Sequence, residues 1–241
     1  MERFVLRYLG AMLRDETVFR ISDECAELGL LVGVMILRGV AIGDSPADLR
    51  GSIQSSAEEV RGRFSGVAAI RETPEVKAFR RIYQAVGVNP NRHPPACQRL
   101  LEMAWRRGDL PRINTLVDLY NMVSIRCLLS LGAHDLGRVT LPIRLGIAAR
   151  DESFTPLGSF GGEDVRRGEF AYVDARHRVL CRLDLVQADV SKITPETSDA
   201  ILIVEGTRAH DRQIFEKASE ALLRLTSDHC GGTAEIVVWP V

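Results

Sequence analysis

The sequence RINTLVDLYNMVSI, residues 112–125, predicts a helix with two contrasting sides. Its apolar residues recur at i, i+3, i+4 and i+7, which is the spacing of a helix that packs one side against a core. These apolar residues are Leu116, Leu119, Tyr120 and Val123. The segment is therefore expected to form a helix at the wall of a folded core.

The other side of this segment carries Asn114, Asp118 and Asn121. At i, i+4 and i+7 these residues lie within roughly 60° of one direction around a helix. Short amide and carboxylate side chains differ from the Glu and Lys that usually solvate the back of a helix, so they are candidates for a polar site. The alternative is local, because Asn114 or Thr115 can cap the helix and Asp118 favours its positive end.

Composition limits the classes of protein to which the chain can belong. Its 241 residues are 46% hydrophobic and 26% charged, which suits one large globular domain or two small ones rather than a disordered chain. The formal net charge of −1 removes the simplest electrostatic case for nucleic-acid binding. Contact with RNA would therefore need a local basic patch.

The sequence favours neither secretion nor insertion into a membrane. The most apolar run, residues 28–37, is too short to cross a bilayer, and the first 16 residues contain acidic side chains where a secretion signal would be basic. The five cysteines are scattered without a CxxC pair, so we expect reduced thiols. They are Cys25, Cys97, Cys127, Cys181 and Cys230. We expect a cytoplasmic protein.

The periodicities in the first half of the chain predict mainly helices, with two strands among them. Residues 1–14 and 17–22 suggest a helix and a short strand that form an added N-terminal arm over residues 1–22. A buried strand is expected next, and then three helices that begin near Ser45, Thr73 and Cys97. The strand covers residues 30–40, and the second and third helices end at Gly87 and Gly108.

From Leu136 onward the pattern changes to strands and loops. Residues 168–185 predict a hairpin with its turn at residues 174–177. Residues 200–206, 211–226 and 234–239 predict a strand, helix, strand unit with parallel strands. We therefore expect an α+β fold with a mixed β-sheet and packed helices, in a single domain over residues 23–241.

Three consecutive stretches together resemble a known family. They are HPPACQRLLEMAWRRGD, LPRINTLVDLYNMVSI and LSLGAHDLGRVTLPIRLGIAARDESF. Their order and spacing are similar to the B3/B4 domain of the bacterial phenylalanyl-tRNA synthetase β chain, from about residue 76 to residue 206. The matching motifs are Val-Asp-x-x-Asn at residues 117–121, His-Asp-Leu-x-Arg at residues 134–138, and Ile-Arg at residues 143–144.

The resemblance implies a B3/4-like fold and an activity. In the synthetase this domain is an editing module that hydrolyses tRNA wrongly charged with tyrosine, so the resemblance implies a free-standing aminoacyl-tRNA deacylase with the tRNA acceptor end as partner. The ungapped match places Gly132 where the synthetases have a histidine, with His134 two residues later. The position that matches the glutamate of their Gly-Gly-Glu string falls after the strand at residues 172–174, near Gln187 and Ala188. This chain also has a Gly-Gly-Glu string at residues 161–163, but that string precedes the hairpin and so has the wrong order.

Ester hydrolysis on aminoacyl-tRNA needs no protein nucleophile, because the ester is activated and the adjacent ribose hydroxyl can assist. Such a site needs an anchor for the ammonium group, donors to an oxyanion and a wall that sizes the side chain. The candidate catalytic residues are Asn121, His134 and Glu169. The candidate substrate-binding residues are Asn114, Asp118, Ser124, Asp135, Arg144 and Arg182.

Each of these candidates also has a purely structural interpretation. Asp118 and Asn121 can tie a loop to the helix, and His134 can be a loop histidine bonded to backbone. Glu169 and Arg182 lie on facing arms of the predicted hairpin and can form a cross-strand ion pair. If these interpretations hold, the same fold would serve as a non-catalytic module that binds RNA, an amino acid or a small ligand.

Other chemistry finds no support in the sequence. The pairs His210-Asp211 and His229-Cys230 flank the predicted helix at residues 211–226, so they are interpreted as caps, and neither has metal-ligand spacing. No G-x-S-x-G elbow, P-loop or dinucleotide glycine pattern occurs, so neither a metal nor a cofactor is expected. Arginine pairs at residues 80–81, 106–107 and 166–167 are either a local patch for RNA or solvated charges.

Overall fold

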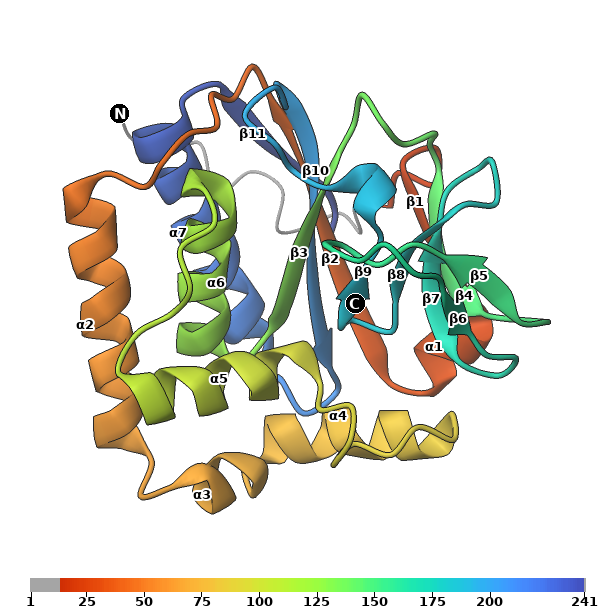
Figure 1. Ribbon diagram of the computed structural model, residues 1–241, viewed down its shortest axis with the longest axis horizontal. Coiled ribbons are helices and arrows are strands. Elements are labelled where there is room, and N and C mark those ends of the chain that lie inside the picture. Colours follow the sequence, from red (N-terminus) through yellow and green to blue (C-terminus); the bar gives the residue numbers. More distant parts are fainter. Residues whose placement is uncertain (1–13, 241) are drawn as a thin grey trace.

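The computed structural model of the chain describes residues 14–240 and arranges them in three layers (Figure 1). The strands are β1 (Phe19–Ile21), β2 (Leu30–Arg38), β3 (Ser130–Asp135), β4 (Ile143–Ile147), β5 (Glu152–Phe154), β6 (Glu163–Val165), β7 (Phe170–Val173), β8 (Val179–Arg182), β9 (Val186–Gln187), β10 (Asp199–Thr207) and β11 (Thr233–Val238). The helices are α1 (Asp23–Glu27), α2 (Ala47–Arg63), α3 (Val67–Arg71), α4 (Pro74–Ala85), α5 (Ala96–Arg107), α6 (Thr115–Cys127), α7 (Arg212–Cys230) and the short 3-10 helix η1 (Asp189–Ser191). A four-stranded sheet lies between a layer of helices and a second sheet.

The central layer is an antiparallel sheet with strand order β11-β2-β10-β3. The two long apolar strands β2 and β10 pair along their whole length, from Asp199 opposite Arg38 to Thr207 opposite Leu30. Strand β11 pairs with the other edge of β2. Because β10 and β11 are both antiparallel to β2, they run parallel to each other, as the sequence predicted, with β2 between them.

Helix α6 is buried on all sides, which the two-sided sequence pattern did not predict. Every residue from Thr115 to Ile125 is buried, including the polar ones. The helix packs against α2, α5, α7 and strand β3, so neighbours cover the polar side as well as the apolar side. Three polar side chains of α6, those of Thr115, Asp118 and Ser124, accordingly form hydrogen bonds inside the protein.

The third layer is a five-stranded sheet with strand order β1-β4-β7-β8-β9. It is a mixed sheet, because β1 is parallel to β4 while β7 and β8 form the predicted antiparallel hairpin. Strand β1 is the short strand predicted near residue 17, and its Phe19 is buried in the main core. A separate hairpin of β5 and β6 packs beside β8.

The predicted helix over residues 1–14 lies outside the described residues except for Arg14, which forms an isolated bridge with Val238. The division of the chain at residue 22 stays a prediction. Within residues 14–240, no helix combines the length and apolar character needed to span a bilayer. The five cysteines are free thiols, three buried and two partly buried.

The helix ends follow the capping chemistry of the sequence. The hydroxyl of Thr73 accepts a hydrogen bond from the N–H of Val76, and Gly108 closes α5 in the left-handed region with φ 68°. Asp211 caps α7 as predicted, but the neighbouring His210 instead points into the core, where its Nε2 lies 2.9 Å from the Leu128 carbonyl. These local signals and the paired sheets together confirm the predicted α+β fold.

Two glycines in the central sheet allow a matched test of how tightly the helix layer is packed. A Cβ at Gly206 would lie 2.5 Å from Phe215 Cζ and 2.7 Å from Leu129 Cδ2, whereas a Cβ at Gly132 would meet nothing within 4 Å. We expect Gly206→Ala to lower the free energy of unfolding by about 1–3 kcal/mol through overpacking. Gly132→Ala should leave stability nearly unchanged or raise it. Urea titrations of both variants measure the difference, and equal midpoints would contradict the packing argument.

Candidate functional site

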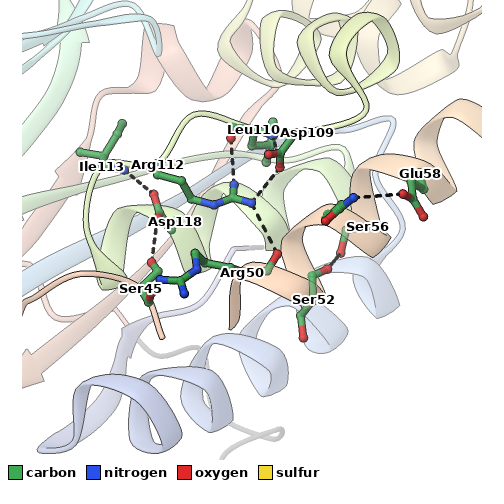
Figure 2. A network of polar contacts seen from close by, with 11 residues as sticks. Ser45, Arg50, Ser52, Ser56, Glu58, Asp109, Leu110, Arg112, Ile113 and Asp118 are labelled. Carbon is green, nitrogen blue, oxygen red and sulfur yellow. Dashed lines mark hydrogen bonds and ion pairs between the residues drawn. The ribbon is translucent and has the colours of Figure 1, made fainter. Parts of the chain in front are cut away.

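The polar residues at the start of α6 hold the loop that precedes it (Figure 2). The Asn114 Oδ1 accepts a hydrogen bond from the N–H of Val117 at 3.0 Å and so caps the helix. The Asp118 carboxylate accepts two bonds, from the Ser45 hydroxyl at 2.6 Å and from the N–H of Ile113 at 2.8 Å. The structural interpretation of Asn114 and Asp118 is therefore confirmed, because both side chains connect loops to the helix.

The same contacts continue outward to the surface (Figure 2). The Arg112 guanidinium donates to the Asp109 carboxylate at 2.8 Å and to the Leu110 carbonyl at 2.8 Å. Arg50 of α2 donates to the Ser45 carbonyl at 2.7 Å. The loops that lead into α2 and α6 are thus fixed to one another by a continuous set of polar contacts.

Farther along α6, Ser124 and Asn121 differ in how they are bonded. The Ser124 hydroxyl donates to the Leu129 carbonyl at 2.5 Å, in a fully buried position. Asn121 is also buried, yet within the part of the chain that the structure describes no hydrogen bond to its amide is recorded. Of the four predicted residues on or next to α6, only Asn121 has a side chain whose polar atoms are uncommitted.

His134 lies in strand β3 rather than in a loop, and its ring bonds a side chain rather than the backbone. Its Nδ1 is 2.8 Å from the Ser191 hydroxyl of η1, and both residues are buried. Burial lowers the pKa of His134 to about 4, so the imidazole is neutral at physiological pH. The prediction of a loop histidine bonded to backbone was wrong, because the motif continues a buried strand.

Asp135 does not orient the neighbouring His134. Its carboxylate accepts hydrogen bonds from the Thr197 hydroxyl and from the N–H of Gly137, each at 2.8 Å. Successive residues of a strand point to opposite faces of the sheet, so an adjacent His and Asp on a strand do not form a dyad. Asp135 instead stabilises the turn that follows β3.

Glu169 and Arg182 form the predicted ion pair between the arms of the β7–β8 hairpin. The contact is bidentate, with Arg182 Nε 2.6 Å from one Glu169 oxygen and Nη2 2.7 Å from the other. Glu163 adds a third contact to Arg182 at 2.6 Å. Burial alone would raise the pKa of Glu169, but the hydrogen bonds and charge of Arg182 outweigh burial and lower it. Arg144 stands apart on β4 with an exposed side chain.

The predicted residues therefore lie in separate parts of the fold. Glu205 and Ser130 are paired in the central sheet, and the Glu205 side chain reaches Tyr172 of the second sheet. Because His134 follows Ser130 by four residues along β3, its side chain is on the same face of the central sheet, the face toward the second sheet. Helix α6 packs with α7 on the opposite side, where Gly206 faces Phe215. The central sheet thus separates Asn121 from His134, and it keeps the predicted residues from forming one pocket.

A cluster of two carboxylates, the buried Glu205 and the partly buried Asp184, was not predicted from the sequence. The Asp184 carboxylate accepts hydrogen bonds from the Tyr83 hydroxyl, the Ser130 hydroxyl and the N–H of Ala96. Burial raises the pKa of Asp184. The signal that could have revealed such a cluster is Glu205, a carboxylic acid inside the apolar run AILIVEG.

Glu205 is the most buried acid of this cluster. Tyr172 donates a hydrogen bond to its Oε2, while its Oε1 is buried without a partner among the described residues. Burial raises the pKa of Glu205 well above the ordinary 4.5, and the nearby charge of Asp184 adds to this effect. Glu205 is consequently a neutral acid in the folded protein at a pH where an exposed glutamate would be ionised.

An open cavity of about 550 Å³, which we call the β5 cavity, lies on the outer side of the second sheet. It is lined by residues 150–155 and 177–179, together with Ala188 and Val190. None of the predicted site residues lines it. His134 is nonetheless close to its wall, because Ser191, to which His134 bonds, directly follows Val190.

Charges of both signs line the β5 cavity. Arg150, Asp151, Glu152 and Arg178 all contribute to its wall. Arg178 is held by the buried Asp174, with Nη2 2.6 Å from a carboxylate oxygen. The Asp151 carboxylate accepts a hydrogen bond from the backbone N–H of Arg167, which follows β6, at 2.7 Å. The wall of the cavity therefore presents both guanidinium and carboxylate groups.

His177 supplies an accessible imidazole at the β5 cavity. It sits in the β7–β8 turn with φ 59°, a left-handed conformation that is uncommon for residues other than glycine. Asp174 holds this turn, because its Oδ1 accepts from the N–H groups of Arg176 and Arg178, each at 3.0 Å. The sequence predicted only a hairpin turn at residues 174–177, since nothing local shows that this turn borders a cavity.

Comparison with known proteins places the chain in a family. The family model described as the B3/4 domain matches residues 78–231 of the 241.

The chain belongs to the B3/4 domain family.

This confirms the resemblance seen in the sequence, and the matched region contains the whole β5 cavity. Among solved structures, the B3/4 chain is similar to an N-terminal fragment of the phenylalanyl-tRNA synthetase β-subunit from Pyrococcus horikoshii, with a TM-score of 0.46 and 10% sequence identity. The match covers 93% of this chain and 52% of the fragment, so this chain spans about half of the fragment's length. No curated protein matches the chain.

The two bonds to Asp118 predict a large effect on stability. We expect Asp118→Ala to lower the free energy of unfolding by roughly 2–4 kcal/mol, because a hydroxyl and an N–H lose their acceptor in a buried place. Asp109→Ala is the matched control in the same set of contacts, and its loss of an exposed ion pair should cost about 1 kcal/mol or less. Denaturant titrations compare the two. Equal losses would show that Asp118 does not hold the loop.

The raised pKa of Glu205 predicts an unusual dependence of stability on pH. Because the pKa of Glu205 is higher in the folded state than the 4.5 of an unfolded chain, the protonated side chain contributes stability fully only below pH 4.5. This contribution is lost as pH rises from 4.5 toward the pKa of the folded state. Glu205→Gln removes the ionisation and can still accept from Tyr172. We therefore expect the melting temperature of Glu205→Gln, relative to that of the wild type, to increase as pH rises from 5 to 8.5.

The control for this measurement is Glu235→Gln, which changes an exposed glutamate of β11 in the same sheet. Its difference from the wild type should stay nearly constant over the same pH range. A constant difference for Glu205→Gln as well would show that Glu205 does not titrate differently in the folded and unfolded states.

Proposed function

We propose that the chain is an aminoacyl-tRNA deacylase that acts in trans, and that the β5 cavity receives the aminoacylated end of the tRNA. The observation that carries the proposal is a cavity with charges of both signs inside the region that defines the B3/4 family. Its volume of about 550 Å³ falls in the range of small-molecule sites, which is roughly 300–1,000 Å³. On this proposal the partner is tRNA and the protein works in the cytoplasm.

The lining of the cavity matches the groups of an aminoacyl ester. The substrate carries a free ammonium group beside the ester, and Asp151 and Glu152 offer carboxylates to hold it. The terminal phosphate is an anion that a guanidinium binds well, and Arg150 lines the same cavity. Arg178 adds a second positive charge that Asp174 holds in place. Substrate would thus be oriented by charge at both ends.

His177 is the group we assign to the chemical step. An imidazole at the wall can accept a proton from the attacking water, while the neighbouring ribose hydroxyl assists departure of the ester oxygen. His134 and Glu169, two of the predicted catalytic residues, become positioning residues. His134 holds η1 through Ser191, and Glu169 holds strand β8 through Arg182.

The alternative is a non-catalytic module that binds RNA, an amino acid or a small ligand through the same cavity. One observation favours it: most of the predicted catalytic and binding side chains are already engaged in internal contacts. Asp118, His134 and Glu169 each have a partner that fixes the fold. Asn121 and the exposed Arg144 are the exceptions, and Asn121 lies on the far side of the central sheet from His134.

Deacylation of a panel of correctly and wrongly charged tRNAs tests the proposal. We expect release from one or a few aminoacyl groups, with His177→Ala lowering kcat by about 10²-fold or more through loss of the general base. His93→Ala changes a histidine that does not line the β5 cavity and should leave kcat unchanged. His134→Ala and Asn121→Ala are measured beside them.

The outcomes separate the assignments. Full activity in His177→Ala together with lost activity in His134→Ala would overturn the role given to His177 and support the residue predicted from sequence. Loss of activity only in Asn121→Ala would move the site to helix α6. Absence of release from every charged tRNA by the wild type would overturn the enzyme proposal and leave the binding module.

A further inference from the structure

Three exposed arginines lie at one end of the β5–β6 hairpin. Arg150 precedes β5, while Arg166 and Arg167 follow β6, and all three side chains are exposed. The two strands are antiparallel with Glu152 opposite Val165, so the same register continued by two residues places Arg150 opposite Arg167. We call these three residues the arginine end of the hairpin.

The turn that carries Arg166 and Arg167 has a fixed backbone. The N–H of Glu169 donates to the Arg166 carbonyl at 3.0 Å, and the N–H of Arg166 donates to a Glu169 carboxylate oxygen at 3.0 Å. Gly168 adopts φ 92°, a conformation that favours glycine. Glu169 is in turn held by its bidentate contact with Arg182. The turn therefore presents two exposed guanidinium groups from a backbone that is already ordered.

The guanidinium groups of the arginine end form no ion pair within residues 14–240. On the same segments, the charge of Glu169 is matched by Arg182. The other two carboxylates, Asp151 and Glu152, line the β5 cavity, and Asp151 accepts from the backbone N–H of Arg167 rather than from its side chain. Like charges that face each other across paired segments are destabilising. An anionic ligand would supply the partner that this end of the hairpin does not have among the described residues.

The fold treats the three arginine pairs of the sequence differently. In the pair at residues 80–81, Arg80 donates to the Pro90 carbonyl at 3.1 Å and so holds a loop. The pair at residues 106–107 ends α5, where the helix dipole favours cations. Neither a contact of this kind nor a helix end accounts for the guanidinium groups at residues 166–167, so a ligand is the remaining explanation for them.

The arginine end has the chemistry of a site for a phosphate backbone. Planar guanidinium groups match the geometry of phosphate oxygens. A protein partner would instead need apolar surface at the centre of the interface. The exposed large hydrophobic side chains of residues 14–240 are Ile113, Leu157, Phe160 and Val190, and none belongs to the segments of the arginine end. Positive charge without apolar surface fits a nucleic acid better than a protein.

We propose that the arginine end binds phosphates of the tRNA acceptor stem, the duplex that adjoins the CCA end. This inference rests on the proposed function, because that function places the end of the tRNA in the β5 cavity. Arg150 lines that cavity, and the N–H of Arg167 bonds Asp151 of its wall, so the arginine end borders the cavity directly. Phosphate contacts position a nucleic acid without reading its sequence. The three arginines are thus positioning residues and take no part in the chemical step.

Fluorescence anisotropy with a labelled RNA hairpin that ends in an unpaired CCA tests this surface. The double variant Arg166→Gln/Arg167→Gln should weaken binding by roughly 10-fold or more, because a bond to a charged group is lost at each position. It should also flatten the plot of log affinity against log salt concentration by about 2, since each phosphate contact contributes about 1 to the slope. The matched control is Arg106→Gln/Arg107→Gln, which removes the same charge and should leave affinity and slope unchanged.

Deacylation kinetics separate this role from the chemistry. For an aminoacyl-tRNA that the wild type hydrolyses, Arg166→Gln/Arg167→Gln should raise KM by a factor similar to the loss of affinity and leave kcat unchanged. Hydrolysis of an aminoacylated CCA trinucleotide, which has no duplex, should be the same in the double variant and the wild type. A fall in kcat with either substrate would overturn the positioning role.

The outcomes distinguish failure of this surface from failure of the proposed function. Equal affinity and slope in Arg166→Gln/Arg167→Gln and the wild type, or no binding of the hairpin by the wild type, overturns the surface, and continued deacylation then leaves the proposed function intact. An equal loss in the control variant also overturns it, because total charge would explain both. Displacement of the hairpin by inorganic phosphate at the same concentration of phosphate groups would indicate a site for a single anion and overturn the RNA assignment. Binding that depends on these arginines without release of any aminoacyl group would support the surface and overturn only the enzyme.

Discussion

The full-length pairing of β2 with β10 is the constraint on which the rest of the structure depends. The two strands are bonded over their whole length and are buried on both faces, with helices on one side and the second sheet on the other. Such strands need continuous apolar sequence, which LLVGVMIL and AILIVEG supply. Strands β3 and β11 extend the sheet at either edge of this pair.

Burial on both faces also determines what polar side chains on the sheet can do. A polar group at such a position must bond inside the protein, and Glu205 with Tyr172 and His134 with Ser191 both do so. The same burial raises the pKa of Glu205 and lowers that of His134, so the neutral form of each side chain is favoured. Neutral side chains that are bonded inside the protein in this way stabilise the fold. The charged and accessible groups lie farther out, around the β5 cavity.

The sequence predicted local structure, whereas the tertiary contacts of the predicted site residues came only from the structure, and one physical difference explains both results. Capping at Thr73, the turn at Gly108 and the β7–β8 hairpin depend on residues that are close in the chain, and each was predicted correctly. Asn121 and His134 belong to motifs of the family resemblance and Glu169 was chosen from the predicted hairpin, and none of these patterns carries information about what covers a residue. His134 was expected in a loop and lies in a buried strand, because its burial depends on η1 more than fifty residues later.

The sequence by itself determined the α+β class, most of the long helices and strands and membership of the B3/4 family, because periodicity, capping and the order of motifs are properties of neighbouring residues. Only the tertiary structure decided that the polar side of α6 is internal, that Glu205 is a neutral acid and that three distant segments line an open cavity. Those segments, at residues 150–155, at residues 177–179 and around Ala188 and Val190, meet because strand pairing brings them together. No local pattern records which strands will pair.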